Sequence, residues 1–172
     1  TMTGRESHEI ASLGVGIKTQ VPNLFDGLTA QENLWLSSRR WHGDRRANTL
    51  VKETIDRLEL GEIRSSIVGS LAHGQRQMVE LGMVVAAEPW LVLLDEPAAG
   101  MTDEETFKTA ELVREINKTG VTIIIVEQNA RRCLQIVDRG YVLDQGKNAY
   151  TGTGKNLAND PKVIELYLGT LA

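Results

Sequence analysis

The chain has 172 residues and a mass of 19.0 kDa, which corresponds to about one domain at roughly 150 residues per domain. Its hydrophobic residues (41%) and charged residues (24%) are in the proportions of an ordinary globular protein, which excludes a disordered tail, a collagen-like chain and a coiled coil. A single cysteine, Cys133, excludes an internal disulfide framework and a multi-cysteine zinc site, and a net charge of −4 excludes a basic field that would attract nucleic acid.

The sequence does not predict insertion into a membrane. The longest apolar runs, such as Leu91–Leu94 and Ile123–Val126, are far shorter than the ~20 residues of a spanning helix. Residues 1–9 are polar and lack the apolar core of a signal peptide. We therefore expect a cytoplasmic protein. Because Thr1 precedes Met2, we also expect the chain to be a fragment or to begin with an expression scar.

The first half of the chain is predicted to be mostly helical and polar, after an ambiguous stretch at residues 8–17. Residues 47–60 place apolar side chains at helical spacing, and Gly61 follows at a C-cap position. The next predicted helix is apolar all round in its second half, which should therefore be buried, and Pro89 ends it. The predicted elements are helices over 31–36, 47–60 and 75–87 and an arginine-rich loop over 37–46.

The second half alternates predicted strands and helices. Continuous apolarity over 90–94 and 121–126 is typical of strands buried on both faces of a parallel sheet. Between them, Thr102 and Glu105 form a capping box that opens a helix ending at Gly120. Strand, helix and strand in succession imply βαβ units, so we expect an α/β core after a helical insertion. The remaining predictions are an apolar helix side at Phe107, Ala110, Val113 and Ile116, a short helix over 127–136, a hairpin at 141–143 and 148–150, and a last helix begun by Asp160-Pro161 with Ile164, Tyr167 and Leu168 inside.

The segment Leu91–Pro97 ends in two acidic residues, Asp95 and Glu96. Open α/β sheets bind ligands at the carboxyl ends of their parallel strands, which is where these side chains would lie. One carboxylate can hold Mg²⁺ through water while the next polarises an attacking water. The simpler alternative is a strand that runs into a polar turn.

The segment Leu71–Gln75 is predicted to stand at the start of a helix. Gly74 would let the backbone approach a ligand, and the unpaired N–H groups of a first helical turn attract an anion. An ordinary glycine-containing helix start would look the same. Its place, with Gln75 20 residues before Asp95, favours the binding interpretation.

Four segments in this order resemble the motifs of the ATP-binding subunit of ABC transporters. They are Lys18-Thr19-Gln20, Leu71 to Gln75, Leu91 to Pro97 and Val126-Glu127-Gln128, which in that family are the Q-loop, the signature motif, the Walker B strand and the switch strand. Finer details are similar to uptake systems for branched-chain amino acids, urea or amides: QVPNLFDGLTAQENL (20–34), LAHGQRQMVELGM (71–83), DEPAAGM (95–101), VEQNARRCLQIVDRGYVL (126–143) and IELYLG (164–169).

The resemblance covers nearly all of the chain from about Ile10 onwards and implies a fold. That fold is the P-loop NTPase-like core of an ABC ATPase, a parallel sheet with an inserted helical subdomain. Residues 1–23 would hold the Q-loop region, 24–86 the helical signature subdomain, and 87–172 the α/β core with the Walker B strand, the switch strand and the C-terminal helix.

The resemblance also implies a role for each matching residue. Gln20 would contact Mg²⁺ and the attacking water, Asp95 would hold Mg²⁺ through water, and Glu96 would orient the water or act as general base. Gln128 stands where the family has its switch histidine and would take its catalytic role. Ala72, His73, Gly74 and Gln75 would face the ATP held by a second ATP-binding subunit. The helical subdomain would meet transmembrane permease subunits, which places the protein on the inner face of the plasma membrane.

The chain departs from the family pattern at several positions. The sequence contains no G-x-x-x-x-G-K-[ST] phosphate loop, and Gly154-Lys155 is no substitute because Ala149 and Asn156 occupy two of the motif positions. Ala72 replaces the usual signature serine, and Thr102 stands at the position of an aspartate in the family's D-loop. We therefore expect an N-terminally truncated ABC ATPase that binds ATP weakly or not at all and is inactive alone.

Two other classes of function stay open. The first is a non-catalytic interaction module that keeps the helical surface facing a partner, and the second is a nucleotide-binding switch on an ABC-like fold that acts with nucleic acid. The arginines at 39, 40, 45 and 46, with two tryptophans nearby, are better explained as a solvated helical surface. Ser70 with His73 lacks a hydrolase motif, and the three histidines lack the spacing of zinc ligands.

Overall fold

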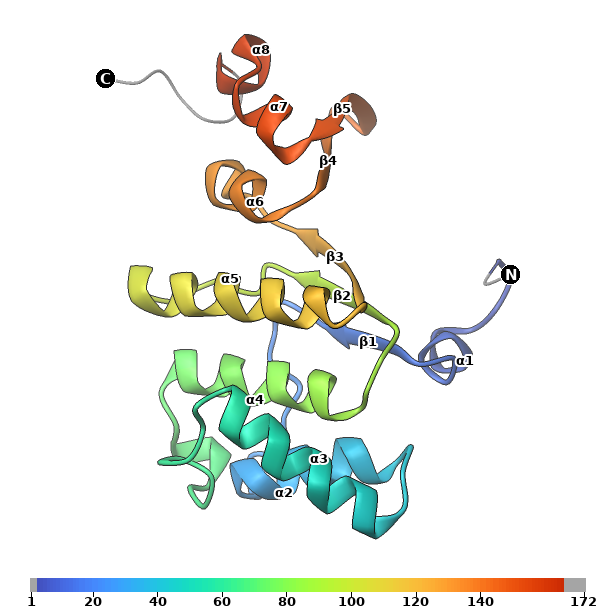
Figure 1. The fold of residues 1–172 in the computed structure, drawn as a ribbon, viewed down its shortest axis with the longest axis vertical. Helices are drawn as coiled ribbons and strands as arrows, with labels where there is room; N and C mark the ends of the chain where they lie inside the picture. The colour runs from blue at the N-terminus through green and yellow to red at the C-terminus, as the bar shows by residue number, and fades with distance from the viewer. Residues whose placement is uncertain (1–2, 166–172) are drawn as a thin grey trace. The chain divides into compact units, whose positions relative to one another are not determined.

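The computed structural model describes residues 3–165 and divides into two units. The first unit contains a three-stranded parallel sheet (Figure 1). The two units are Thr1–Val126 and Glu127–Ala172. The strands are β1 (Val15–Lys18), β2 (Leu91–Asp95) and β3 (Thr122–Val126), in the order β1-β2-β3. All pairs are parallel, with Ile17 opposite Leu93 and Leu93 opposite Ile124. The predicted α/β fold with a parallel sheet is confirmed.

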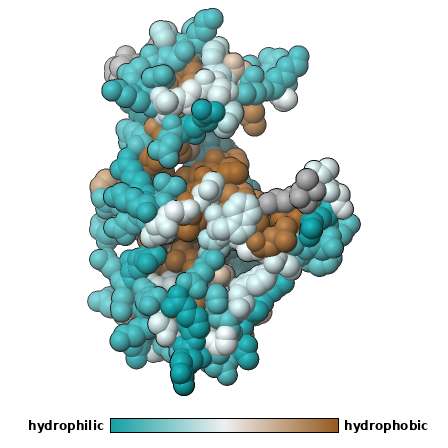
Figure 2. All heavy atoms as spheres, turned by 45° about the vertical axis from the view of Figure 1, so that its right-hand side comes forward, coloured by the Kyte–Doolittle hydropathy of each residue, from teal (hydrophilic) through white to brown (hydrophobic). Residues whose placement is uncertain are grey.

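One face of this sheet packs on helices α4 (His73–Ala86) and α5 (Asp103–Lys118). Val92 and Leu94 of β2 are 2% and 1% exposed on this face, and Gly16 of β1 lies so close to Val84 of α4 that a Cβ would overlap it. The continuous apolar runs predict strands buried on both faces, and for β3 this prediction is wrong. Because α4 and α5 cover the same face, Ile124 stays 52% exposed on the other. Figure 2 shows that apolar residues also reach the surface of the molecule.

Three helices form the part of the first unit below the sheet in Figure 1: α2 (Ala30–Arg39), α3 (Asp44–Arg57) and the outer side of α4. The short helices α1 (Ser7–Ala11) and η1 (Val68–Ser70) complete this unit. Thr29 caps α2 by accepting a hydrogen bond from the Glu32 N–H. The first-half helices are therefore confirmed, although α4 already begins at His73.

The boundaries of α2 and α3 differ from the prediction. The arginine-rich loop expected over 37–46 is reduced to residues 40–43, because both helices extend into it and bury Ser38 and Ala47. α3 ends at Arg57 rather than at Gly61. The turn instead uses Glu59, at φ 54°, which lets the buried Leu60 donate its N–H to Ile55 O at 3.0 Å.

Helix α5 begins and ends where predicted. The Thr102 side chain caps it, and Gly120 follows with φ 94°, a conformation that favours glycine. The expected apolar side is wrong at Phe107, which is 62% exposed. The buried stripe consists of Thr109, Leu112, Val113 and Ile116.

The second unit has its own small core around Leu134, Leu157 and Val163. The predicted hairpin is confirmed, with Gln145 and Gly146 both at positive φ in the turn. Asp160 caps the last helix as expected; Ile164 is half-buried, and Tyr167 and Leu168 lie outside the described residues. The elements are α6 (Ala130–Ile136), β4 (Arg139–Asp144), β5 (Lys147–Thr153), α7 (Gly154–Ala158) and α8 (Pro161–Val163). Across residues 3–165, every helix is too short or too polar to cross a membrane.

Candidate functional site

Gln20 and Glu96 meet at the carboxyl edge of the sheet. Gln20 follows β1 and Glu96 follows β2, and because neighbouring parallel strands end at the same edge, residues 76 positions apart come together. The Gln20 Nε2 amide donates a hydrogen bond to Glu96 Oε2 at 3.0 Å. The bond orients one carboxylate oxygen of Glu96 and holds the loop after β1 beside it.

The backbone of Glu96 is in a conformation that glycine usually adopts. Its φ is +45°, in the left-handed region, which costs a non-glycine residue about 1–2 kcal/mol. The Glu96 N–H donates to Val126 O of β3 at 2.9 Å, and Pro97 behind it is buried. The strand end therefore fixes the direction of the Glu96 side chain, and strain of this kind is often found at functional sites.

Asp95 ends β2 with its side chain exposed to solvent. Carboxylate and carboxamide oxygens are hard ligands that suit Mg²⁺, which usually binds one or two protein groups together with substrate phosphates and waters. Asp95 and Gln20 stand at the ends of the neighbouring strands β2 and β1 and supply such oxygens. The donor set fits Mg²⁺, and groups of three or more His, Cys, Asp or Glu arranged for a metal are absent from the described residues.

The segment 71–75 forms the start of α4, as predicted. Ala72 is the N-cap residue in extended conformation, and its N–H donates to Gln75 Oε1 at 3.1 Å. Ala72 has no side-chain oxygen with which to bond the first turn, so the N–H groups of Gly74 and Gln75 lack a cap from it. Such a helix start attracts an anion.

His73 connects this helix start to the loop that follows Glu96. The His73 Nε2 atom lies 3.1 Å from Ala99 O, and its ring lies against Gly100, where a Cβ would come within 3.0 Å of it. Gly100 has φ +72°, so both its conformation and this contact favour glycine. The segment 71–75 and the loop after Glu96 are therefore in direct contact within the first unit.

Gly74 makes a second contact of the same kind. A Cβ on Gly74 would overlap the Glu105 carboxylate near the start of α5. The Thr102 N–H and hydroxyl both donate to Glu105 Oε2, and these bonds hold the pKa of the Glu105 carboxyl below its ordinary value. A glycine is thus required at position 74 for this charged side chain to lie beside the helix start.

Gln128 is the one predicted site residue in the second unit. It precedes α6, and its carbonyl accepts a hydrogen bond from the Ala130 N–H at 2.9 Å. Its catalytic role stays a prediction. The structure thus brings Gln20 to Glu96 and the segment 71–75 to the loop after Glu96.

The sequence did not predict that Lys18 and Glu80 would be paired. Lys18 ends β1 and Glu80 lies in α4; they are 1% and 4% exposed, and Lys18 Nζ lies 3.5 Å from Glu80 Oε2. Burial raises the pKa of the Glu80 carboxyl, against the opposing effect of the Asn23 N–H and of Lys18. The only signal in the sequence was that Lys18 ends one apolar run and Glu80 lies inside another.

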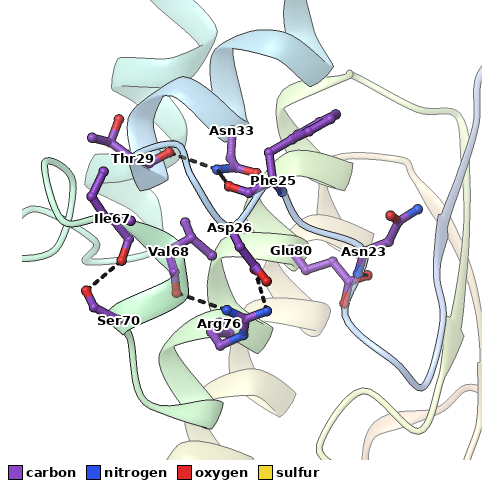
Figure 3. A network of polar contacts seen from close by, with 10 residues as sticks. All are labelled: Asn23, Phe25, Asp26, Thr29, Asn33, Ile67, Val68, Ser70, Arg76 and Glu80. Atoms are coloured by element: carbon purple, nitrogen blue, oxygen red, sulfur yellow. Dashed lines mark hydrogen bonds and ion pairs between the residues drawn. The ribbon is translucent and has the colours of Figure 1, made fainter.

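The chain after Gln20 is held to the helices by polar side chains (Figure 3). The Asn23 N–H donates to Glu80 Oε1 at 2.9 Å. The Asn33 side chain accepts from the Phe25 N–H at 2.8 Å and donates to Phe25 O and Thr29 O. Arg76, one turn before Glu80 on α4, donates to Asp26 at 2.7 Å and to Val68 O at 3.1 Å.

The chain is similar to known proteins in sequence and in fold. A sequence profile for the ABC transporter family matches residues 1–99. The chain is 30% identical over 164 residues to the lipopolysaccharide export system ATP-binding protein LptB of Haemophilus influenzae, a match that covers 94% of this chain and 68% of that protein. It is 31% identical over 170 residues to the high-affinity branched-chain amino acid transport ATP-binding protein BraG of Pseudomonas aeruginosa, covering 98% of this chain and 72% of that one.

A solved structure shares the fold. The ATP-binding cassette MJ1267 of an ABC transporter, in its ADP conformation, superposes with a TM-score of 0.79 at 25% identity over 98% of this chain and 73% of that chain. ATP-binding subunits of ABC transporters bind nucleotide, dimerise and work with transmembrane permeases. From its profile match and its relatives, this chain belongs to the ABC transporter family as an ATP-binding domain.

Proposed function

We propose that this chain belongs to the ATP-hydrolysing subunit of an ABC importer for branched-chain amino acids, urea or amides. The observation that carries the proposal is the hydrogen bond from Gln20 to Glu96 at the carboxyl edge of the sheet. The relative BraG supports the amino acid branch, whereas the relative LptB belongs to an export system. The motif details over 20–34, 71–83 and 95–101 favour uptake.

In this proposal Glu96 is the group that acts on the attacking water. Its carboxylate accepts a hydrogen bond from the water and takes up its proton, while the water oxygen attacks the γ-phosphorus of ATP and the bond from that phosphorus to the bridging oxygen of ADP breaks. Gln20 holds the carboxylate in place through its amide, and its oxygen and Asp95 would hold Mg²⁺. Bound Mg²⁺ neutralises the negative charge that develops on the phosphates. Gln128 stands at the sequence position of the family's switch histidine and would take its role in turnover.

The start of α4 would serve the ATP bound to a second ATP-binding subunit. Ala72, His73, Gly74 and Gln75 form the exposed beginning of this helix, where N–H groups attract phosphate oxygens. His73 joins this segment to the loop after Glu96. Each subunit would therefore link its own Glu96 to the ATP of its partner.

The surface that would meet the permease begins directly after Gln20. Val21 and Phe25 are 75% and 54% exposed, and Phe25 is held by Asn33 through both of its backbone groups. Exposed apolar side chains on an ordered backbone are typical of protein interfaces. A partner seated here would lie next to Gln20, and the subunit would be cytoplasmic, on the inner face of the plasma membrane.

A non-catalytic interaction module is the second candidate for the 172-residue chain itself. The sequence contains no G-x-x-x-x-G-K-[ST] segment, and this loop supplies much of the phosphate contact in P-loop NTPases. The chain alone would then bind Mg-ATP weakly, while the surface around Val21 and Phe25 stays available to a partner.

ATP turnover by the subunit assembled with its permease tests the proposed importer. We expect turnover in proteoliposomes to rise when a branched-chain amino acid, urea or a short amide is offered with its binding protein. The solute that stimulates turnover identifies the branch. Turnover that responds to none of these solutes, or that responds to a lipopolysaccharide instead, contradicts the importer assignment.

A further inference from the structure

Lys18 and Glu80 form a buried ion pair between the sheet and the middle of α4. Lys18 is the last residue of β1, and its side chain lies on the face that packs against α4. The ammonium is also 3.4 Å from Thr19 O. The pair therefore fixes the point at which the chain leaves the sheet toward Gln20.

The second oxygen of Glu80 fixes the other end of the same segment. Glu80 Oε1 accepts the Asn23 N–H at 2.9 Å, a contact visible in Figure 3. The residues between these two anchor points are 19–22, and Gln20 is among them. Asn33 and Arg76 act further along, at Phe25 and Asp26, so the short segment that carries Gln20 is anchored to α4 by Glu80.

A gain in stability does not account for this pair. Two buried charges must lose their hydration, and apolar side chains of similar size usually stabilise a fold as well or better. Glu80 Oε2 is buried and accepts no hydrogen bond in the described part of the chain, and the ammonium at 3.5 Å is a loose partner for it. The raised pKa of the Glu80 carboxyl agrees with this incomplete compensation. A role in geometry fits these observations better.

We propose that Lys18 and Glu80 are positioning residues for Gln20: they hold the segment 19–23 between β1 and α4 so that the Gln20 amide reaches the Glu96 carboxylate. This proposal rests on the proposed function, in which Gln20 and Glu96 act on ATP. It adds to the proposed site two buried residues that act through Gln20.

The test compares two neutral replacements of the pair. Lys18→Met with Glu80→Leu removes both charges and the acceptor for the Asn23 N–H. Lys18→Met with Glu80→Gln removes both charges but keeps an acceptor oxygen at the same place. Lys108→Met with Glu104→Leu removes an exposed ion pair of 3.0 Å from α5 and serves as the matched control.

Two readouts are measured. Hydrogen exchange of the Asn23 amide in the 172-residue chain reports the anchor directly, and kcat and KM for ATP are measured in the subunit assembled with its permease. For Lys18→Met with Glu80→Leu (the Leu variant), we expect hydrogen exchange of the Asn23 amide to accelerate about tenfold, as for the loss of one hydrogen bond. We also expect kcat to fall about tenfold or more while KM changes less than about threefold. Lys18→Met with Glu80→Gln (the Gln variant) should restore slow exchange of the Asn23 amide and most of the wild-type kcat. Lys108→Met with Glu104→Leu should match the wild type in both measurements.

The proposal is overturned if the Leu and Gln variants behave alike, or if kcat falls without faster exchange at Asn23. If Glu80→Leu prevents folding, Glu80→Met takes its place, since methionine adapts to an irregular space. Glu96→Gln in the same assembly separates the two claims. If it leaves turnover intact, the proposed function fails; if it stops turnover while the Leu variant keeps wild-type kcat and exchange, only the positioning role fails.

Discussion

At the scale of single residues, the candidate site depends on side chains that are far apart in the sequence. The Gln20 amide reaches Glu96 across 76 positions, and Lys18 reaches Glu80 across the packing of β1 on α4. Glu96 itself adopts a left-handed backbone conformation that its side chain disfavours. The residues with a proposed chemical role are thus held in position by neighbouring residues that have no proposed chemical role themselves.

The buried pair leads to a prediction about stability. Lys18→Met or Glu80→Leu alone should lower the free energy of unfolding by about 3–5 kcal/mol, because each leaves one uncompensated buried charge. The double variant should be at least as stable as the wild type. Urea unfolding of the four proteins checks this, and a double variant less stable than both single variants would contradict it.

The Lys18–Glu80 pair also predicts how the stability of the fold changes with pH. The pKa of Glu80 is raised in the folded chain, so protonation favours folding, and the stability contributed by this group is present at acidic pH and lost as the pH rises through the raised pKa. The advantage of the double variant over the wild type should therefore be larger at neutral than at acidic pH.

At the scale of elements, capping residues and apolar runs predicted most of the fold. Thr102 opens α5 and Asp160 opens α8 where expected, because their side chains bond the first turn of the helix locally. The errors concern tertiary packing. Phe107 has helical spacing but lies outside the buried stripe, and β3 has an apolar sequence but one exposed face, because α4 and α5 cover the same side of the sheet.

The exposed face of β3 leads to a prediction about association. Within residues 3–165, β3 stands at the edge of its sheet and carries Ile124 and Val126 at 52% and 59% exposure. An apolar edge strand is a template for pairing with another chain. The 172-residue chain should therefore self-associate with rising concentration in sedimentation experiments.

Ile124→Lys should suppress this association, because a charge on an edge strand discourages pairing. Phe107→Lys replaces another exposed apolar residue, on α5 at 62% exposure, and is the matched control. A chain that stays monomeric at every concentration, or that responds to both substitutions equally, would show that β3 is not the contact.

At the scale of the whole molecule, the order of four short motifs identified the family. The contacts between residues of different motifs could be seen only in the structure. Asp95 and Glu96 could be named from the sequence because they stand at the end of a predicted strand, and Gln20 because it matches the family's Q-loop. Lys18 and Glu80 could not, because a charged residue in an apolar run gives no indication of its partner. The division of the chain at residues 23 and 86 stays a prediction, as does the role of Gln128.

ATP turnover by the assembled subunit carrying Glu96→Gln tests the proposed role of Glu96. If Glu96 acts on the attacking water, turnover should fall by about 10²–10⁴-fold while Mg-ATP binding is unchanged, because the glutamine keeps the size of the side chain but cannot accept the proton. Glu115→Gln, on the exposed side of α5, should leave turnover at the wild-type rate. Turnover of the Glu96→Gln protein within about threefold of the wild type would contradict the account, since loss of a general base costs far more.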